Sequence, residues 1–151
     1  MAPGPRLYVL DVGSIGVKNG AAVPAGRGRD MYRVPVAAYV ITHPAGNVLY
    51  DTGMDVGTID NPAAVWGSLL DRLVPYMREE DHILRRLQSI GLSPRDISYV
   101  FLSHLHCDHA GGIRLFPDAE FVLQRTELET PIPEEMSLFY PEPYRDARYD
   151  G

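Results

Sequence analysis

The strongest constraint on this chain is a dense group of metal-binding side chains in residues 102–112. The segment reads LSHLHCDHAGG and contains His104, His106, Asp108 and His109 within six consecutive positions. An apolar run leads into it and a glycine pair leads out of it. Because side chains two residues apart share a face of an extended segment, His104 and His106 are predicted to face one metal ion together.

Asp108 and His109 follow where the chain is expected to turn, so we predict that they face a second metal position close by. Imidazole and carboxylate ligands suit zinc, iron or manganese. Without a cation, burial of such a cluster would be very costly. The alternative is a polar loop of solvated histidines, but the dense spacing between an apolar run and a glycine pair favours metal binding.

This spacing resembles the metal motif of the metallo-β-lactamase-fold hydrolases. In that superfamily the first two histidines bind one metal and the Asp-His pair binds the other. The resemblance implies that His104 and His106 bind the first metal, and that Asp108 and His109 bind the second. It also implies an α/β fold, the αββα sandwich, of which this chain covers the first sheet and its helices.

Composition limits the function classes. A chain of 151 residues with 45% hydrophobic and 23% charged residues suits one small globular domain. The formal net charge of −6 disfavours a nucleic-acid surface. The single cysteine, Cys107, excludes an internal disulfide and fits a reducing compartment. No apolar run reaches membrane-spanning length and the N-terminus lacks a secretory pattern, so we expect a cytoplasmic protein without a membrane partner.

Local patterns predict strands, helices and loops along the chain. Helices are expected at 63–74, with Asn61 as N-cap, and at 79–90, with a possible helix start at 126–130. The Gly- and Ala-rich residues 13–29 are predicted to form a long loop, which either borders the site or is a surface connection. The strands are predicted at 7–10, 34–42, 48–50, 99–102 and 120–124.

Asp51 follows one predicted strand and precedes a glycine. The stretch VLYDTGM resembles the strand-end aspartate of the superfamily, which implies that Asp51 supports the metal loop by hydrogen bonds. The alternative is an Asx turn or a helix cap. Of the remaining histidines, His43 is predicted to be solvated in a turn and His82 to lie at a surface or boundary.

Several stretches outside the metal motif resemble bacterial N-acyl homoserine lactonases. They include VLYDTGMD, MREEDHILRRLQSIGLSPRDISYV and FVLQRTELE, and the resemblance runs from about residue 31 to residue 129. That family opens the lactone ring of acyl homoserine lactone signals and so silences quorum sensing. The resemblance implies a small-molecule lactone substrate, two zinc ions (with iron, manganese or cobalt as alternatives) and Asp108 as the residue that takes the proton of the reacting water.

The sequence departs from the family in two ways. Members commonly have an aromatic residue at the position of Cys107. The thiol of Cys107 could pack against neighbouring side chains, alter the wall of the substrate pocket or add a sulfur ligand to a metal ion. No histidine follows His109, whereas the second half of the family supplies further metal ligands. We therefore expect a partial sequence, with residues 1–130 as the N-terminal part of the domain and residues 131–151 as an irregular, Pro- and Tyr-rich start of the missing half.

A halved sandwich is expected to leave one apolar sheet face uncovered, which makes a homodimer possible. Two other functions stay open from the sequence. One is another hydrolase of the superfamily, acting on a thioester or phosphodiester. The other is a non-catalytic half-domain that binds metal weakly or pairs with a partner.

Overall fold

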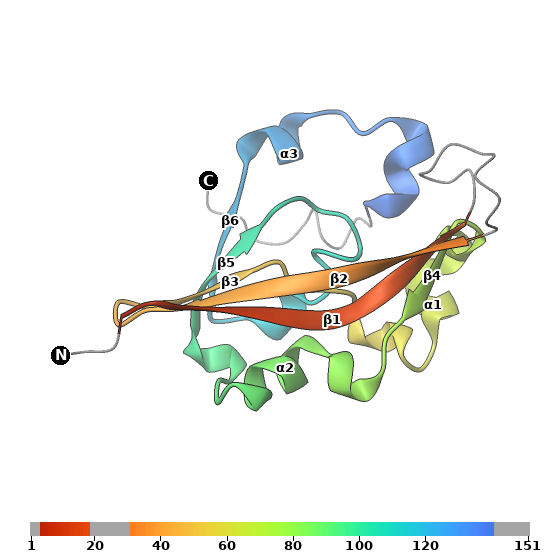
Figure 1. The fold of residues 1–151 in the computed structure, drawn as a ribbon. Coiled ribbons are helices and arrows are strands. Elements are labelled where there is room, and N and C mark those ends of the chain that lie inside the picture. Colours follow the sequence, from red (N-terminus) through yellow and green to blue (C-terminus); the bar gives the residue numbers. More distant parts are fainter. Residues whose placement is uncertain (1–3, 19–30, 141–151) are drawn as a thin grey trace.

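The computed structural model describes residues 4–18 and 31–140, and these residues form one six-stranded mixed sheet in the order β4-β1-β2-β3-β5-β6 (Figure 1). The pairs β4-β1, β1-β2 and β2-β3 are antiparallel, whereas the pairs β3-β5 and β5-β6 are parallel. The strands are β1 Arg6–Lys18, β2 Met31–Thr42, β3 Asn47–Tyr50, β4 Leu73–Tyr76, β5 Ile97–Leu102 and β6 Glu120–Leu123.

Short helices connect these strands, and α1 and α2 lie on the same side of the sheet (Figure 1). The α-helices are α1 Pro62–Trp66, α2 Ile83–Ser89 and α3 Arg125–Glu129. The 3-10 helices are Val56–Thr58, Gly67–Asp71, Glu79–Asp81, Pro94–Asp96, Ile113–Leu115 and Glu134–Phe139. In the part of the chain that the structure describes, no helix is long and apolar enough to span a membrane.

The sheet has one buried face, which forms the core with α2. Side chains alternate between the two faces of a strand, and in β2 the buried positions are Val36, Ala38 and Val40. Ile83 and Leu87 of α2 are buried in the same core. This packing explains why the apolar runs of the sequence predict β2, β3, β5 and β6 close to where they lie, and β1 in part.

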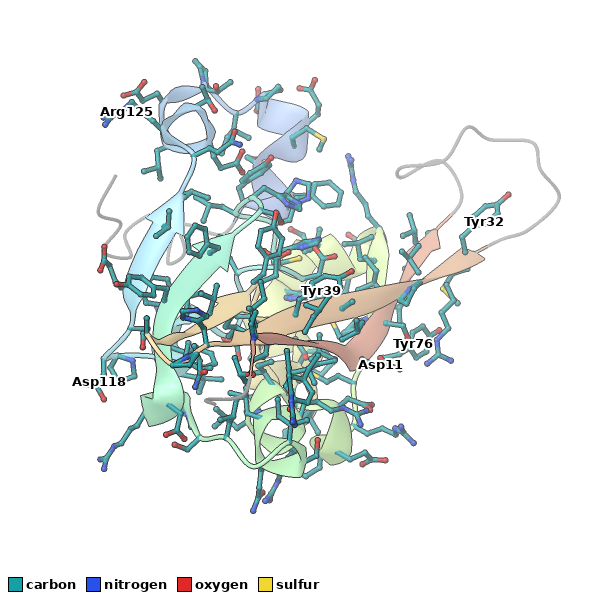
Figure 2. The ribbon with its side chains drawn as sticks, turned by 60° about the vertical axis from the view of Figure 1, so that its left-hand side comes forward. Asp11, Tyr32, Tyr39, Tyr76, Asp118 and Arg125 are labelled. Carbon is teal, nitrogen blue, oxygen red and sulfur yellow. The ribbon has the colours of Figure 1, made fainter. Side chains whose placement is uncertain are left out.

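The opposite face of the sheet carries large apolar side chains that are 37–65% exposed, and we call it the apolar face. Its residues come from four neighbouring strands and lie in register across them: Val9 is opposite Tyr39, Tyr39 opposite Tyr50, and Tyr50 opposite Phe101. Figure 2 marks the position of Tyr39 on β2. The expected uncovered face is therefore present, and it consists of Leu7, Val9, Tyr39, Ile41, Tyr50, Tyr99 and Phe101.

The prediction of one helix over residues 63–74 is wrong. Its N-cap is correct, because Asn61 accepts a hydrogen bond from the Ala64 amide at 3.1 Å, but α1 ends at Trp66. Gly67 has a φ of 49°, which breaks the helix, and Leu73–Tyr76 then pairs with β1 as strand β4. Pairing with a distant strand overrides the local helical spacing of the leucines.

The predicted loop at 13–29 is also wrong where the structure describes it, since residues 13–18 continue β1. Strand β1 bulges between Asp11 and Ser14, and Gly13 has a φ of 106° there. A Cβ at Gly13 would lie 2.8 Å from the carbonyl oxygen of Tyr76, so the glycine serves close packing of β4 rather than a flexible loop. Residues 19–29 lie outside the described residues.

His82 is buried rather than at the surface, with only 7% exposure. It divides the helix predicted at 79–90 into the 3-10 helix Glu79–Asp81 and α2. Its Nδ1 accepts a hydrogen bond from the Leu84 amide at 3.0 Å and so caps α2. Histidine is not among the preferred N-cap residues, which is why the sequence pattern gives no sign of this role.

The segment after Pro131 is more ordered than the sequence predicts. Glu134–Phe139 forms a 3-10 helix and the side chain of Phe139 is buried. Residues 141–151, the rest of the expected irregular segment, lie outside the described residues.

The apolar face predicts that the chain self-associates. At increasing concentration, sedimentation should give a mass above the 16.8 kDa of one chain, because water contact with this face is unfavourable. Val9→Lys should lower the association, whereas Leu138→Lys should not, because the exposed Leu138 lies in the 3-10 helix Glu134–Phe139, outside the apolar face. A monomer at all concentrations would contradict the prediction.

Burial of His82 predicts a loss of stability in acid. Burial lowers the pKa of His82 in the folded chain below the ordinary value of 6.5, so the unfolded chain takes up the proton first as the pH falls. This contribution to stability is present above about pH 6.5 and is lost as the pH falls below it. His82→Asn keeps a capping side-chain oxygen but does not titrate.

Urea unfolding with a chelator at pH 7 and pH 5 measures this effect. The free energy of unfolding should fall less between these pH values in His82→Asn than in the unchanged chain. His43→Asn is the control, because His43 is exposed in a turn. If the free energy of unfolding falls equally in His82→Asn and in the unchanged chain, His82 does not contribute to the loss of stability in acid.

Candidate metal centre

The predicted ligands lie where two parallel strands end side by side. Tyr50 at the end of β3 is opposite Phe101 in β5, and the Asp51 amide donates to the Phe101 carbonyl at 2.9 Å. Residues 103–109, which we call the metal loop, follow β5 directly. Loops at the carboxyl ends of parallel strands are common places for functional sites.

Asp51 connects β3 to both ends of the metal loop. Its Oδ1 accepts a hydrogen bond from the Ser103 amide at 2.8 Å, and its Oδ2 accepts one from the Ser103 hydroxyl at 2.8 Å. Oδ2 also lies 2.8 Å from Nδ1 of His109. These partners lie more than fifty residues along the chain, whereas an Asx turn or a helix cap would bond to neighbouring backbone groups.

Thr52 holds the turn of the metal loop, a role that no local sequence pattern predicts. Its amide and its hydroxyl both donate to the His109 carbonyl, at 2.7 and 2.9 Å, and its hydroxyl accepts from the Gly112 amide at 2.9 Å. Thr52 is completely buried. A Cβ at Gly111 would collide with the backbone of Met54 and Asp55, so the glycine pair allows the two chain segments to touch.

The four predicted ligands lie together. The ring centroid of His104 lies 4.4 Å from that of His106 and 4.1 Å from that of His109. His109 Nε2 lies 3.3 Å from Asp108 Oδ2. His43 and His82 occupy other elements, as described above, and do not join this cluster.

One donor atom of the cluster is suited to a metal ion. Nε2 of His106 is buried without a hydrogen-bond partner, which is costly for a polar atom and would be relieved by a metal ion. Across the described ranges, 4–18 and 31–140, no group of three or more His, Cys, Asp or Glu side chains is arranged so that it could hold a metal ion. The cluster by itself therefore does not form the complete ligand set of a structural metal site.

The surroundings of the cluster shift the pKa values of its histidines in opposite directions. Burial, and then the charge of His104, lower the pKa of His106 to about 4, so its ring is neutral and ready to bind a cation. Burial also lowers the pKa of His104.

His109 behaves differently, because it lies between two carboxylates. Burial alone would lower its pKa, but hydrogen bonds with Asp108 and Asp51 outweigh burial and raise the pKa to about 9. For Asp108, burial would raise the pKa, but the hydrogen bond and the charge of His109 leave the pKa below its ordinary value. A cation that binds His109 must therefore displace a proton, which makes metal uptake dependent on pH.

The segment from α3 to Tyr140 packs against the metal loop. Glu127 Oε1 accepts from the Leu105 amide at 2.9 Å, and the Phe139 carbonyl accepts from the Cys107 amide at 3.0 Å. The ring centroid of Tyr140 lies 4.4 Å from that of His106. Glu127 and Tyr140 are not predicted from the sequence, because no local pattern links them to a loop about twenty or more residues earlier.

Cys107 is completely buried in the core. Burial raises the pKa of its thiol well above the usual range, and this disfavours the thiolate that binds metals. These observations support the packing role among the alternatives for Cys107.

This chain belongs to the metallo-beta-lactamase superfamily, whose family description matches residues 31–148. The N-acyl homoserine lactonase AttM of Azorhizobium caulinodans is 39% identical over 125 residues, which are 82% of this chain and 47% of that protein. The N-acyl homoserine lactonase AiiA of Bacillus thuringiensis subsp. kurstaki is 33% identical over 125 residues, 82% of this chain and 50% of that protein. The predicted resemblance to these lactonases is thus confirmed.

A solved structure confirms the predicted fold class. It is an N-acyl homoserine lactone hydrolase with the product N-hexanoyl-L-homoserine bound at its catalytic metal center. The TM-score is 0.71 at 32% sequence identity, and the match covers 92% of this chain and 56% of that one. This chain spans about half the length of the curated relatives that it matches.

In a protein that carries the complete ligand set, the contacts of Asp51 predict that Asp51→Asn weakens zinc binding by roughly ten- to a hundredfold. Asn tolerates the φ of 61° at this position, so the backbone can keep its shape. Its amide group, however, cannot accept from all the donors that the carboxylate meets. Competition with a chelator measures the zinc affinity.

Asp118→Asn is the matched control, because Asp118 is exposed just before β6 (Figure 2). Equal zinc affinity in Asp51→Asn and in the unchanged chain would exclude a supporting role for Asp51.

Proposed function

We propose that this chain is the N-terminal part of a metal-dependent hydrolase that opens the lactone ring of N-acyl homoserine lactones. The observation that supports it most is the cluster of His104, His106, Asp108 and His109, joined to Asp51, in a chain 39% identical to a lactonase. In this proposal residues 1–130 belong to the N-terminal part of the domain and residues 131–151 begin the other part. The protein would act in the cytoplasm, without a nucleic-acid partner.

The proposed cofactor is a pair of zinc ions, with iron, manganese or cobalt as alternatives. His104 and His106 would hold one ion, and Asp108 and His109 the other. Bound metal ions would polarise the lactone carbonyl and lower the pKa of a water molecule. The neutral state of the His106 ring supports this assignment, because only a neutral imidazole offers a nitrogen to a cation.

Asp108 is the proposed proton acceptor. Its pKa lies below the ordinary value because of His109, so the carboxylate is charged at neutral pH and can accept a proton. One carboxylate oxygen can bind a cation while the other takes the proton, whereas the ring nitrogens of a bound histidine are not free to do so. Asp108 would then pass the proton to the alcohol that leaves when the ring opens.

A substrate panel tests the proposal on a chimera, in which residues 1–148 of this chain are followed by the C-terminal half of the Azorhizobium lactonase. The chimera should open N-acyl homoserine lactones faster than it hydrolyses β-lactams, thioesters or phosphodiesters. Asp108→Asn should lower kcat by roughly a hundredfold or more, because a general base is lost. A preference for a thioester or a phosphodiester would contradict the lactonase proposal.

The 151-residue chain alone is the control for the chimera. It should bind fewer zinc ions than the proposed pair and open no lactone above background. Two protein ligands for each ion are fewer than the three that catalytic zinc usually has. Tight binding of both ions with clear turnover would show that other residues of this chain complete the site.

A further inference from the structure

Helix α3 begins where β6 ends, next to the metal loop. Strands β5 and β6 are parallel neighbours with Leu102 opposite Leu123, so their carboxyl ends lie at one edge of the sheet. Figure 2 shows Asp118 and Arg125 at opposite ends of β6, with Arg125 on α3. The loop that follows β5 and the helix that follows β6 are therefore placed side by side.

One side chain of α3 crosses to the metal loop. Oε1 of Glu127 accepts a hydrogen bond from the backbone amide of Leu105 at 2.9 Å, although the two residues are 22 positions apart. Leu105 is completely buried and lies between His104 and His106. A buried backbone N–H requires a partner, and Glu127 supplies it.

We infer that Glu127 is a positioning residue, which holds the backbone between the two histidines so that both rings face the same side. The side chain of Leu105 points into the core, while His104 and His106 on either side of it are only partly buried. Their ring centroids are 4.4 Å apart. If the loop shifted by one residue, a histidine would take the place of Leu105 in the core. The hydrogen bond from the Leu105 amide to Glu127 opposes that shift.

This role rests on the proposed metal site, but the contact itself does not need a metal. Glu127 bonds to the backbone and is not one of the four predicted ligands. Helix α3 also supplies a matched control, since Glu129 is exposed and lies 3.8 Å from Arg125 in a surface ion pair.

The test uses the 151-residue chain with Glu127→Ala, Glu127→Gln and Glu129→Ala. In chelator, hydrogen exchange of the Leu105 amide should be slow in the unchanged chain and about tenfold or more faster in Glu127→Ala, which loses a charged acceptor. Cobalt or zinc affinity should fall by about tenfold in Glu127→Ala. Glu127→Gln keeps an acceptor oxygen, so its Leu105 exchange rate and its metal affinity should stay close to those of the unchanged chain. Glu129→Ala should change neither the exchange rate nor the metal affinity.

Three results would overturn the inference. The Leu105 amide of the unchanged chain could exchange as fast as an exposed loop amide, a measurement that does not depend on how the variants fold. In Glu127→Gln, the Leu105 amide could exchange as fast and the metal affinity could fall as far as in Glu127→Ala, which would show that the charge of Glu127 matters rather than its hydrogen bond. Metal affinity could stay unchanged in Glu127→Ala although its Leu105 amide exchanges faster.

Failure of the proposed function gives a different result. If the chimera with the C-terminal half of the Azorhizobium lactonase binds no metal, the proposed metal site is wrong. The Leu105 exchange rate and the contact between the His104 and His106 rings, both followed by NMR, then still decide whether Glu127 positions this loop.

Discussion

The carboxylate of Asp51 is the interaction on which the candidate site depends. It lies at the end of β3, is 3% exposed, and bonds to Ser103 at the start of the metal loop and to His109 at its end. A buried carboxylate is stable only when donors surround it, so the loop must keep a shape that presents these donors. The parallel pairing of β3 and β5 brings Asp51 and Ser103 together, and the sheet thereby determines the geometry of the cluster.

Three further contacts hold the same loop from different directions. Thr52 binds its turn, Glu127 binds its middle, and the Phe139 carbonyl accepts from the Cys107 amide. The loop has little helix or strand structure of its own, so these side-chain and backbone bonds replace a regular ladder. The predicted ligands thus project from a rigid support, which is what binding and catalysis require.

The sequence predicts features that depend on neighbours along the chain. The apolar runs of β2 and β5 and the Asn61 cap are local patterns, and the structure has them where they were expected. The spacing of the histidines is also local, and their side chains lie together. Strand β4 and the extension of β1 were missed, because each forms only by pairing with a distant strand. Thr52 and Glu127 were missed for a similar reason: nothing around them shows which loop they hold, and only the three-dimensional fold does.

The long separations within the site also affect the order of folding. Strands β2 and β3 are joined by a tight turn, and we expect them to pair early, because closing a short loop costs little entropy. Asp51 can reach Ser103 and His109 only after β5 has docked beside β3, across a separation of more than fifty residues. Contacts of this range form late and slow the search for the native state. We therefore expect residues 103–109 to take their final shape only after the sheet has formed.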